Sequence, residues 1–286
     1  MYWGAVPSRY PCHLPGRGSS PDFRRGRVTH RSTGRVVYVA TGERHIREAA
    51  ASLESLWRNE PGTPVTMYVD RPSRRHLRAW GIPTPSRFDR LEVIDHPDPT
   101  YTWTDKPIAL SQGDGGHERV LFLDTDTRVC GSIAEIFEML DSFVLAAAHA
   151  PIRLDRRQPA FLARRVPGAF PELNTGVIAF RRTASVQRVL ERWRLMHLEI
   201  LRSIDTGSLG DQATFRVALY ESDVRFTVLP PEYNCRFTFP TYVHGPVRIL
   251  HGRSPDLEGI EREVNGTSGP RVFVPGVGIL KAWPDG

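Results

Sequence analysis

Apolar residues along this chain fall into two patterns, short β-branched runs and longer stretches with helical spacing. The run at residues 35 to 40 is followed, after Thr41, by a stretch at residues 43 to 58 in which apolar side chains recur on one helix face. Such a pair predicts a strand and an amphipathic helix, the opening βα unit of a parallel sheet.

The same two patterns continue through the chain. The run Arg-Val-Leu-Phe-Leu at residues 119 to 123 is apolar at consecutive positions, which is typical of a strand buried on both faces. We therefore predict an α/β fold, with a mainly parallel sheet flanked by helices in a single domain at residues 35 to 286. Further strands are expected at 64–69, 90–94, 142–148, 176–180, 225–229, 247–251 and 271–274, and helices at 74–80, 106–112, 185–202 and 211–220.

Charge is distributed unevenly. The 286 residues carry a net charge of +6, and residues 1 to 35 account for it, because they hold seven arginines and one aspartate. Residues 1 to 34 are also rich in Pro, Gly and Ser, so we expect a disordered basic arm. Since the remaining residues are balanced, no nucleic-acid partner is expected, although an RNA-binding or scaffold protein with a basic arm stays as an alternative.

Hydropathy bears on the expected location. No apolar run has the length of a signal peptide or of a membrane span. We therefore expect a cytoplasmic protein without an integral membrane segment. No pattern in the sequence predicts an oligomeric state.

Two aspartates one residue apart, Asp124 and Asp126, follow the buried strand at residues 119 to 123. Open α/β sheets bind ligands at the carboxyl ends of their strands. Burial of two unpaired carboxylates would be costly, whereas in an extended turn both can approach one hard cation. The pattern favours a divalent metal site, and a solvated turn is the alternative.

The segment at residues 120 to 127 resembles the strand and Asp-x-Asp motif of GT-A glycosyltransferases, in particular the retaining family that includes glycogenin and bacterial lipopolysaccharide galactosyltransferases. Four further segments are similar to that family's motifs and follow in its order. They are Leu-Asn-Thr-Gly-Val at 173–177, Asp-Gln at 211–212, Leu-Pro-Pro-Glu-Tyr-Asn at 229–234 and Leu-His-Gly at 250–252. The resemblance implies a GT-A fold and hexosyl transfer from a nucleotide-diphosphate sugar, with a UDP-sugar as first choice, and retention of configuration.

The resemblance also assigns residues. Asp124, Asp126 and His251 would hold the cation, and carboxylates with one imidazole suit Mn²⁺ best, with Mg²⁺ as the second choice. Asp211 would bind sugar hydroxyls, Gln212 would lie near the anomeric carbon on the face opposite the leaving group, and Asn174 would be a third catalytic residue facing the same cleft. The acceptor, whether a saccharide, a natural product or a protein, stays unassigned. The donor-binding positions would be Ala40, Thr41, Gly42, His45, Lys106, Asp124, Thr125, Asp126, Gly252 and Arg253.

The sequence departs from the family pattern at two places. Residues 42 to 45, Gly-Glu-Arg-His, replace the family's acidic and aromatic residues after the first strand, which leaves His45 as a candidate platform for the base. The family's lysine a few residues after the late histidine is absent, and Arg253 is the candidate for supplying its charge.

Simpler interpretations stay open for single residues. Lys106 could be a solvated lysine at a helix start, Asp211 a helix cap and His251 a core histidine. Residues 121 to 127 also fit the Asp-x-Asp-x-Thr signature of haloacid-dehalogenase-like phosphatases, in which Asp124 would be the nucleophile and Asp126 a general acid. That signature normally opens its domain, whereas several α/β units precede it here.

Residues 150 to 170 hold five arginines and are expected to form a long loop without regular structure, because Pro151, Pro159 and Pro167 interrupt it. A loop of this length in a compact domain is usually functional or mobile. We predict that it closes over the active site when the donor is bound, since arginine suits phosphate oxygens. A solvated surface loop is the alternative.

Overall fold

The computed structural model describes residues 34–80, 90–93, 105–112, 117–152, 160–203 and 210–281. The predicted arm, apart from Gly34, lies outside these residues, so its disorder stays a prediction. Within the same ranges, no helix combines the length and the apolar character that a bilayer span requires.

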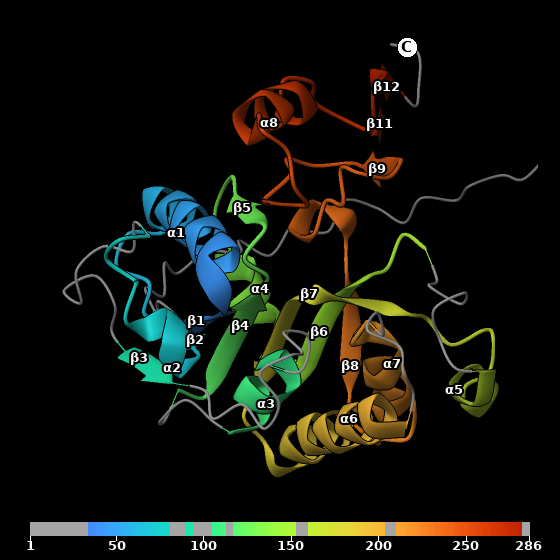
Figure 1. Cartoon of the computed structure of the whole chain (residues 1–286). Coiled ribbons are helices and arrows are strands. Elements are labelled where there is room, and N and C mark those ends of the chain that lie inside the picture. The colour runs from blue at the N-terminus through green and yellow to red at the C-terminus, as the bar shows by residue number, and fades with distance from the viewer. Residues whose placement is uncertain are drawn as a thin grey trace, which may run out of the picture. The chain divides into compact units, whose positions relative to one another are not determined.

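A seven-stranded sheet is at the centre of the fold (Figure 1), and its strand order is β3-β2-β1-β4-β7-β6-β8. All neighbouring strands pair in parallel except β7, which runs antiparallel to both β4 and β6. The predicted mainly parallel sheet is thus confirmed. The strands are β1 (Arg35–Val39), β2 (Val65–Val69), β3 (Arg90–Val93), β4 (Arg119–Leu123), β6 (Leu145–His149), β7 (Leu173–Arg181) and β8 (Phe226–Leu229).

The direction of β7 positions the site. Because β7 is antiparallel to β4, its first residues lie at the edge where β1 and β4 end. Leu123 pairs with Val177, and the Asp124 backbone N–H donates to the Gly176 carbonyl at 2.7 Å. The polar residues at the start of β7 therefore lie beside the Asp-Thr-Asp turn.

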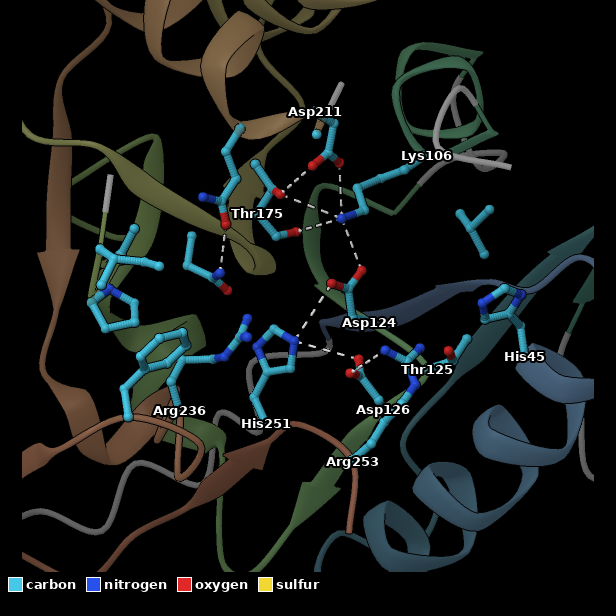
Figure 2. A pocket seen from close by; sticks show the side chains of 18 of the residues that line it. His45, Lys106, Asp124, Thr125, Asp126, Thr175, Asp211, Arg236, His251 and Arg253 are labelled. Atoms are coloured by element: carbon cyan, nitrogen blue, oxygen red, sulfur yellow. Dashed lines mark hydrogen bonds and ion pairs between the residues drawn. The ribbon is translucent and has the colours of Figure 1, made fainter. Parts of the chain in front are cut away.

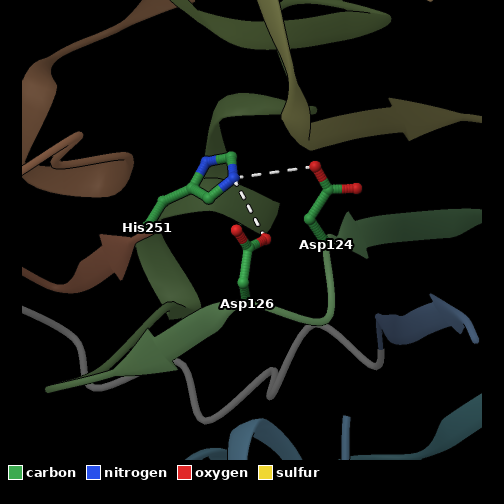
Figure 3. A group of neighbouring side chains, drawn as sticks. All are labelled: Asp124, Asp126 and His251. Atoms are coloured by element: carbon green, nitrogen blue, oxygen red, sulfur yellow. Dashed lines mark ion pairs between the residues drawn. The ribbon is translucent and has the colours of Figure 1, made fainter. Parts of the chain in front are cut away.

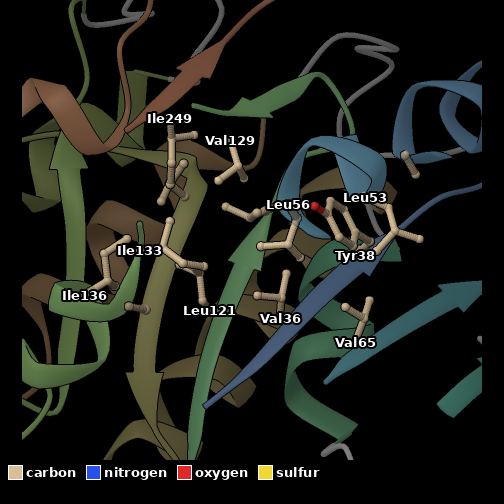
Figure 4. Packing of buried hydrophobic residues seen from close by; sticks show 14 of the residues in the cluster. Val36, Tyr38, Leu53, Leu56, Val65, Leu121, Val129, Ile133, Ile136 and Ile249 are labelled. Carbon is tan, nitrogen blue, oxygen red and sulfur yellow. The ribbon is translucent and has the colours of Figure 1, made fainter. Parts of the chain in front are cut away.

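Helices cover both faces of the sheet, because successive strand residues point to opposite sides. Val36 and Tyr38 pack with α1 (Gly42–Asn59) and α4 (Ala134–Met139), as Figure 4 shows for the α1 side. Val37 packs on the other face. That face is covered by α3 (Asp105–Gln112), α6 (Ala184–Ser203) and α7 (Gln212–Tyr220).

A smaller layer follows in the C-terminal part of the chain. The strand β5 (Thr127–Val129) pairs antiparallel with β10 (Ile249–His251), and His251 stands opposite Thr127. This pairing brings a residue from near the C-terminus next to the Asp-Thr-Asp turn. The rest of the layer comprises η4 (Pro231–Tyr233), α8 (Leu257–Asn265) and a sheet of β9 (Thr241–Val243), β11 (Arg271–Val274) and β12 (Gly278–Lys281).

The strands expected at 142–148 and 176–180 have other bounds, as β6 (Leu145–His149) and β7 (Leu173–Arg181), and two further predictions were wrong. The helix expected at 74–80 is instead α2 (Arg71–Arg74), because the side chain of Asp70 caps it by accepting from the Ser73 N–H and a proline stands in its first turn. The loop expected at 150–170 contains α5 (Ala160–Arg165), since prolines before and after a helix are compatible with it and Leu162 packs in a cluster with residues of α6 and α7.

Candidate functional site

A cavity of about 280 Å³ lies at the carboxyl ends of β1 and β4. Figure 2 shows that its walls come from elements far apart in the sequence, including α1, α3, β7 and the segment after β10. Eleven of the residues predicted for the site line it: Thr41, His45, Lys106, Asp124, Thr125, Asp126, Asn174, Asp211, Gln212, His251 and Arg253.

Three predicted donor-binding residues do not line this cavity. Ala40 is buried and its N–H donates to the Tyr68 carbonyl at 2.9 Å. Gly42 opens α1 with a φ of 76°. Gly252 has a φ of 139°, and a side chain there would also approach the Phe237 ring to 3.1 Å. The last two positions therefore need glycine for the backbone turn.

Asp124, Asp126 and His251 converge on one point (Figure 3). The Nε2 atom of His251 lies 3.6 Å from Oδ2 of Asp124 and 3.4 Å from Oδ1 of Asp126. One ligand atom from each residue lies within 4.8 Å of the others. Gly176 permits this approach, because a Cβ atom at that position would lie 1.9 Å from Cε1 of His251.

A chain of side-chain amides fixes which nitrogen of His251 faces the carboxylates. The Gly176 backbone N–H can only donate, so the Asn174 atom 3.1 Å from it is an acceptor oxygen. That oxygen also receives the Asn234 side-chain NH₂ at 2.9 Å. Asn234 then presents its own oxygen to Nδ1 of His251 at 2.8 Å. Nδ1 therefore carries the proton, and Nε2 faces the two aspartates.

This arrangement fits a divalent cation. Nε2 of His251, when it carries no proton, and the two carboxylates can all donate an electron pair to one cation, which would take the place of a proton shared between the ring and the carboxylates. Metal-bound histidines usually donate their other ring N–H to a carbonyl or carboxylate, as Nδ1 does here to Asn234. His251 is 2% exposed and its Nε2 faces two carboxylates, so the ligand role is compatible with the geometry and stays a prediction.

The surroundings of Asp126 favour its ionised form. Burial acts to raise the pKa of its carboxyl, but the hydrogen bond and charge of His251 and the charges of Arg253 and Arg236 outweigh it and hold the pKa well below its usual range. The carboxylate is thus available to a cation without loss of a proton.

Lys106 connects Asp124, one of the candidate metal ligands, with Asp211. Its Nζ lies 2.9 Å from Oδ1 of Asp124 and 2.9 Å from Oδ2 of Asp211. Burial acts to lower the pKa of Lys106, but the charges of the two aspartates raise it above its ordinary value. With Lys106 only 8% exposed, the solvated-lysine interpretation is wrong.

Asp211 stands at the N-cap of α7 but does not cap it, because its side chain makes no capping hydrogen bond. Its Oδ1 instead accepts from the Thr175 hydroxyl at 2.8 Å. The next residue, Gln212, accepts from the Asn174 amide at 2.6 Å and donates to Glu172 at 3.2 Å. The capping interpretation of Asp211 is therefore excluded, and the three predicted sugar-site residues adjoin one another.

Comparison with known proteins gives a likeness of fold. No protein-family model and no curated protein matches the sequence. Among solved structures, mouse xyloside xylosyltransferase 1 in its apo form is similar over 77% of this chain and 97% of its own, with a TM-score of 0.51 and 17% identity. The chain has the GT-A fold.

Two other solved structures are similar to this GT-A chain at lower scores. The galactosyltransferase LgtC, in complex with donor and acceptor sugar analogues, is 18% identical over 77% of this chain and 87% of its own, with a TM-score of 0.48. The glycosyltransferase GlyE of Streptococcus pneumoniae TIGR4 is 18% identical over 82% of this chain and 61% of its own, with a TM-score of 0.49.

In this GT-A chain, Glu48 on α1 holds Arg253 at the cavity edge. The Arg253 Nε and Nη2 donate to the two Glu48 oxygens at 2.7 and 3.0 Å, and Nη1 lies 3.2 Å from Oδ2 of Asp126. Thr125 also donates to Glu48, at 3.1 Å. Glu48 was not predicted for the site, because its place on the helix pattern does not indicate which loop it meets.

His45 lines the GT-A cavity on the α1 side. Its Nδ1 lies 2.8 Å from the Thr41 carbonyl, which can only accept, so Nδ1 carries the proton. In the neutral ring Nε2 is then an acceptor. The structure thus places His45 at the cavity with a defined tautomer, while its contact with a base stays a prediction.

The cavity of the GT-A chain also has members that the sequence analysis did not select. Arg236 and Phe239 lie after the Leu-Pro...Asn segment, and the Arg236 guanidinium lies over the Phe239 ring, 5.8 Å from its centroid. The only sequence signal for Arg236 is its position two residues after Asn234. The further lining residues are Val39, Ala150, Pro151, Ile152, Thr175 and Gly210.

The arginine-rich segment contributes to the GT-A cavity only through Ala150, Pro151 and Ile152 among the residues described. Residues 153 to 159, which hold three of its arginines, lie outside the described ranges. Arg165 on α5 forms an ion pair with Glu221, which follows α7. Closure of this segment over a donor therefore stays a prediction.

Proposed function

We propose that the chain is a metal-dependent glycosyltransferase that moves a sugar from a nucleotide-diphosphate sugar to an acceptor. The observation that carries this proposal is the convergence of Asp124, Asp126 and His251 in a cavity that also contains Lys106 and Asp211, at the carboxyl edge of a GT-A sheet. Such an edge is where open α/β sheets bind ligands.

The charges of the cavity support a diphosphate ligand. Apart from the histidines, the charged lining residues in the described part of the chain are three cations and three carboxylates, which balance. A divalent cation bound at the carboxylates would add two positive charges that these side chains do not neutralise. The doubly anionic diphosphate of a sugar nucleotide would neutralise that excess. The balanced residues are Lys106, Arg236, Arg253, Asp124, Asp126 and Asp211.

Asp124, Asp126 and His251 would hold the cation, for which Mn²⁺ is the first choice and Mg²⁺ the second. When bound, such a cation supplies Lewis-acid stabilisation of the negative charge that develops on the leaving diphosphate. Asp124 can serve the cation through Oδ2 while its Oδ1 keeps Lys106 in place. Lys106 would then lie between the metal site and the sugar site and add a second positive charge near the leaving group.

The sugar would lie against Asn174, Asp211 and Gln212. Asp211 offers a carboxylate held by Thr175 and Lys106, which is suited to accept from sugar hydroxyls. Gln212 and Asn174 are fixed by their mutual hydrogen bond and by Glu172, so their amides are ordered before substrate arrives. We propose a UDP-sugar as donor, with the base near Thr41 and His45.

We further propose retention of configuration. An inverting enzyme needs a carboxylate base beside the acceptor. Among the residues described, each carboxylate that lines the cavity is already engaged: Asp124 and Asp211 by Lys106, and Asp126 by Arg253. The hexosyl nature of the sugar and a cytoplasmic location remain predictions from the sequence, and the acceptor stays unassigned.

The phosphatase alternative fits the site less well. In that class Asp126 would be a general acid and would have to carry a proton near neutral pH. The net effect of its surroundings, in which His251 and Arg253 outweigh burial, is a lowered pKa. Asp126 is therefore suited to bind a cation and unsuited to deliver a proton.

A panel of sugar nucleotides tests the proposal. Purified protein is incubated with each donor and with Mn²⁺, Mg²⁺ or a chelator, and release of the nucleoside diphosphate is followed with and without candidate acceptors. We expect metal-dependent turnover of one nucleotide class, with Asp126→Asn lowering the rate about 100-fold or more. Equal turnover of one donor in chelator, or in Asp126→Asn, would show that the metal assignment is wrong.

A further inference from the structure

Arg236 is a cationic side chain that lines the cavity, and in the described part of the chain its N–H donors are not bound to a carboxylate. Lys106 is shared between Asp124 and Asp211, and Arg253 is bound by Glu48 and Asp126. In the described part of the chain, Arg236 makes no side-chain hydrogen bond or ion pair, and its Nε is buried without a hydrogen-bond partner. A buried guanidinium N–H without a partner is costly and indicates a ligand.

Arg236 lies near the metal site. Figure 2 shows its guanidinium beside the His251 ring, on the side away from Arg253. The charges of Asp126 and Asp124 act on it. The Phe239 ring supports the guanidinium, which limits its motion without using its N–H groups. Arg236 is therefore held in the cavity by its aromatic neighbour and is left with open donors.

We propose that Arg236 binds the diphosphate of the donor, opposite the cation held by Asp124, Asp126 and His251. This inference rests on the proposed function and names a diphosphate-binding residue that the sequence analysis had left to Arg253. A planar guanidinium matches phosphate oxygens with paired hydrogen bonds. Arg253 has its Nε and both terminal nitrogens engaged by Glu48 and Asp126, so its donors are less available.

The proposal predicts that the charge of Arg236 opposes the binding of a divalent cation alone and favours the binding of a diphosphate. Without a diphosphate, Arg236 and a divalent cation repel each other, because both are positive and lie in one partly buried cavity. With a diphosphate between them, each favours the same ligand. Loss of the Arg236 charge should therefore leave Mn²⁺ binding unchanged or tighter, while it weakens the binding of a diphosphate to the metal-loaded protein. General damage to the site would weaken both.

The experiment uses full-length protein and calorimetry. Mn²⁺ is titrated alone, and inorganic pyrophosphate and UDP are titrated at saturating Mn²⁺, into wild-type protein and Arg236→Gln. We expect pyrophosphate and UDP affinity to fall about 10-fold or more in the variant, the scale of a lost charge-assisted hydrogen bond. Uridine binding should not change.

Arg225→Gln is the matched control, because Arg225 also lies over an aromatic ring, Phe143 at 4.9 Å, but does not line the cavity. We expect it to bind pyrophosphate like wild type. Equal pyrophosphate and UDP affinities in Arg236→Gln and wild type would overturn the proposal, and so would a parallel loss of Mn²⁺ affinity. The proposed function itself fails if wild-type protein binds pyrophosphate but not UDP, or if it binds neither of the two.

Discussion

The side-chain oxygen of Asn234 accepts the Nδ1 proton of His251 at 2.8 Å, and this contact aims Nε2 of the ring at Asp124 and Asp126. Asn234 is itself oriented by Asn174, whose oxygen is fixed by the Gly176 backbone N–H. The proposed metal site is thus oriented by a chain of hydrogen bonds that begins at the backbone of β7. Because Asn174 also contacts Gln212, the same chain reaches the proposed sugar site.

Replacement of Asn234 should weaken metal binding although Asn234 is not a ligand. Asn234→Ala removes the acceptor for Nδ1, so the ring can adopt the tautomer with its proton on Nε2. We expect Mn²⁺ affinity to fall about 10- to 100-fold, as for other partners of metal-bound histidines. Calorimetric titration of Mn²⁺ measures it. Asn265→Ala, which loses hydrogen bonds to Val247 away from the cavity, is the control, and equal Mn²⁺ affinities in both variants would refute the role of Asn234.

Removal of Lys106 should destabilise the fold. Lys106→Ala leaves Asp211, whose side chain is 4% exposed, and Asp124 without their cation. Loss of one partner of a buried ion pair costs about 3–5 kcal/mol. Urea unfolding in chelator measures the free energy, and adding Asp211→Asn to this variant should recover part of the loss. A change below about 1 kcal/mol, typical of an exposed pair, would contradict the buried network.

The pairing of Glu48 with Arg253 should appear in the pH dependence of stability. Burial acts to raise the pKa of Glu48, but hydrogen bonds from Arg253, Arg44 and Thr125 and the charge of Arg253 outweigh it and lower the pKa below its ordinary value. A carboxyl with a lowered folded-state pKa stabilises the fold above its unfolded pKa, and this stabilisation is lost as the pH falls through the folded value.

Glu48→Gln should therefore be less stable than wild type by about 0.5–1 kcal/mol near neutral pH, because the partner Arg253 is half exposed, and the difference should vanish in acid. Thermal unfolding across the acid range measures it. Glu54→Gln, an exposed position on the same helix, should change little at any pH. A Glu48→Gln difference that is constant with pH would contradict the assignment.

Part of this structure could be predicted from the sequence and part could not. The strand β4 and the aspartates after it were predictable, because a continuous apolar run and a polar turn are adjacent in sequence. The direction of β7 could not be predicted, since an apolar run has the same pattern in a parallel strand and in an antiparallel strand. The short strand β5 was also missed, because three residues show no period, yet its pairing with β10 brings His251 to the proposed metal site.

Side-chain partners were the least predictable feature. The family resemblance selected Asn174, Asp211 and Gln212 as a group, and the structure brings them together. It could not select Arg236, since an arginine between apolar residues has many possible partners. The helix α5 was missed for another reason. Three prolines indicated a loop, but a helix fits between two of them and buries Leu162.

The most direct test of the account is the affinity of UDP in the presence and absence of metal. UDP is titrated calorimetrically into wild-type protein and Asp126→Asn, each at saturating Mn²⁺ and in chelator. We expect clear binding only for wild type with Mn²⁺, and affinity lower by about 100-fold or more in the other three conditions. Equal UDP affinity in chelator and in Mn²⁺, or equal affinity of Asp126→Asn and wild type, would contradict a metal-held diphosphate at Asp124, Asp126 and His251.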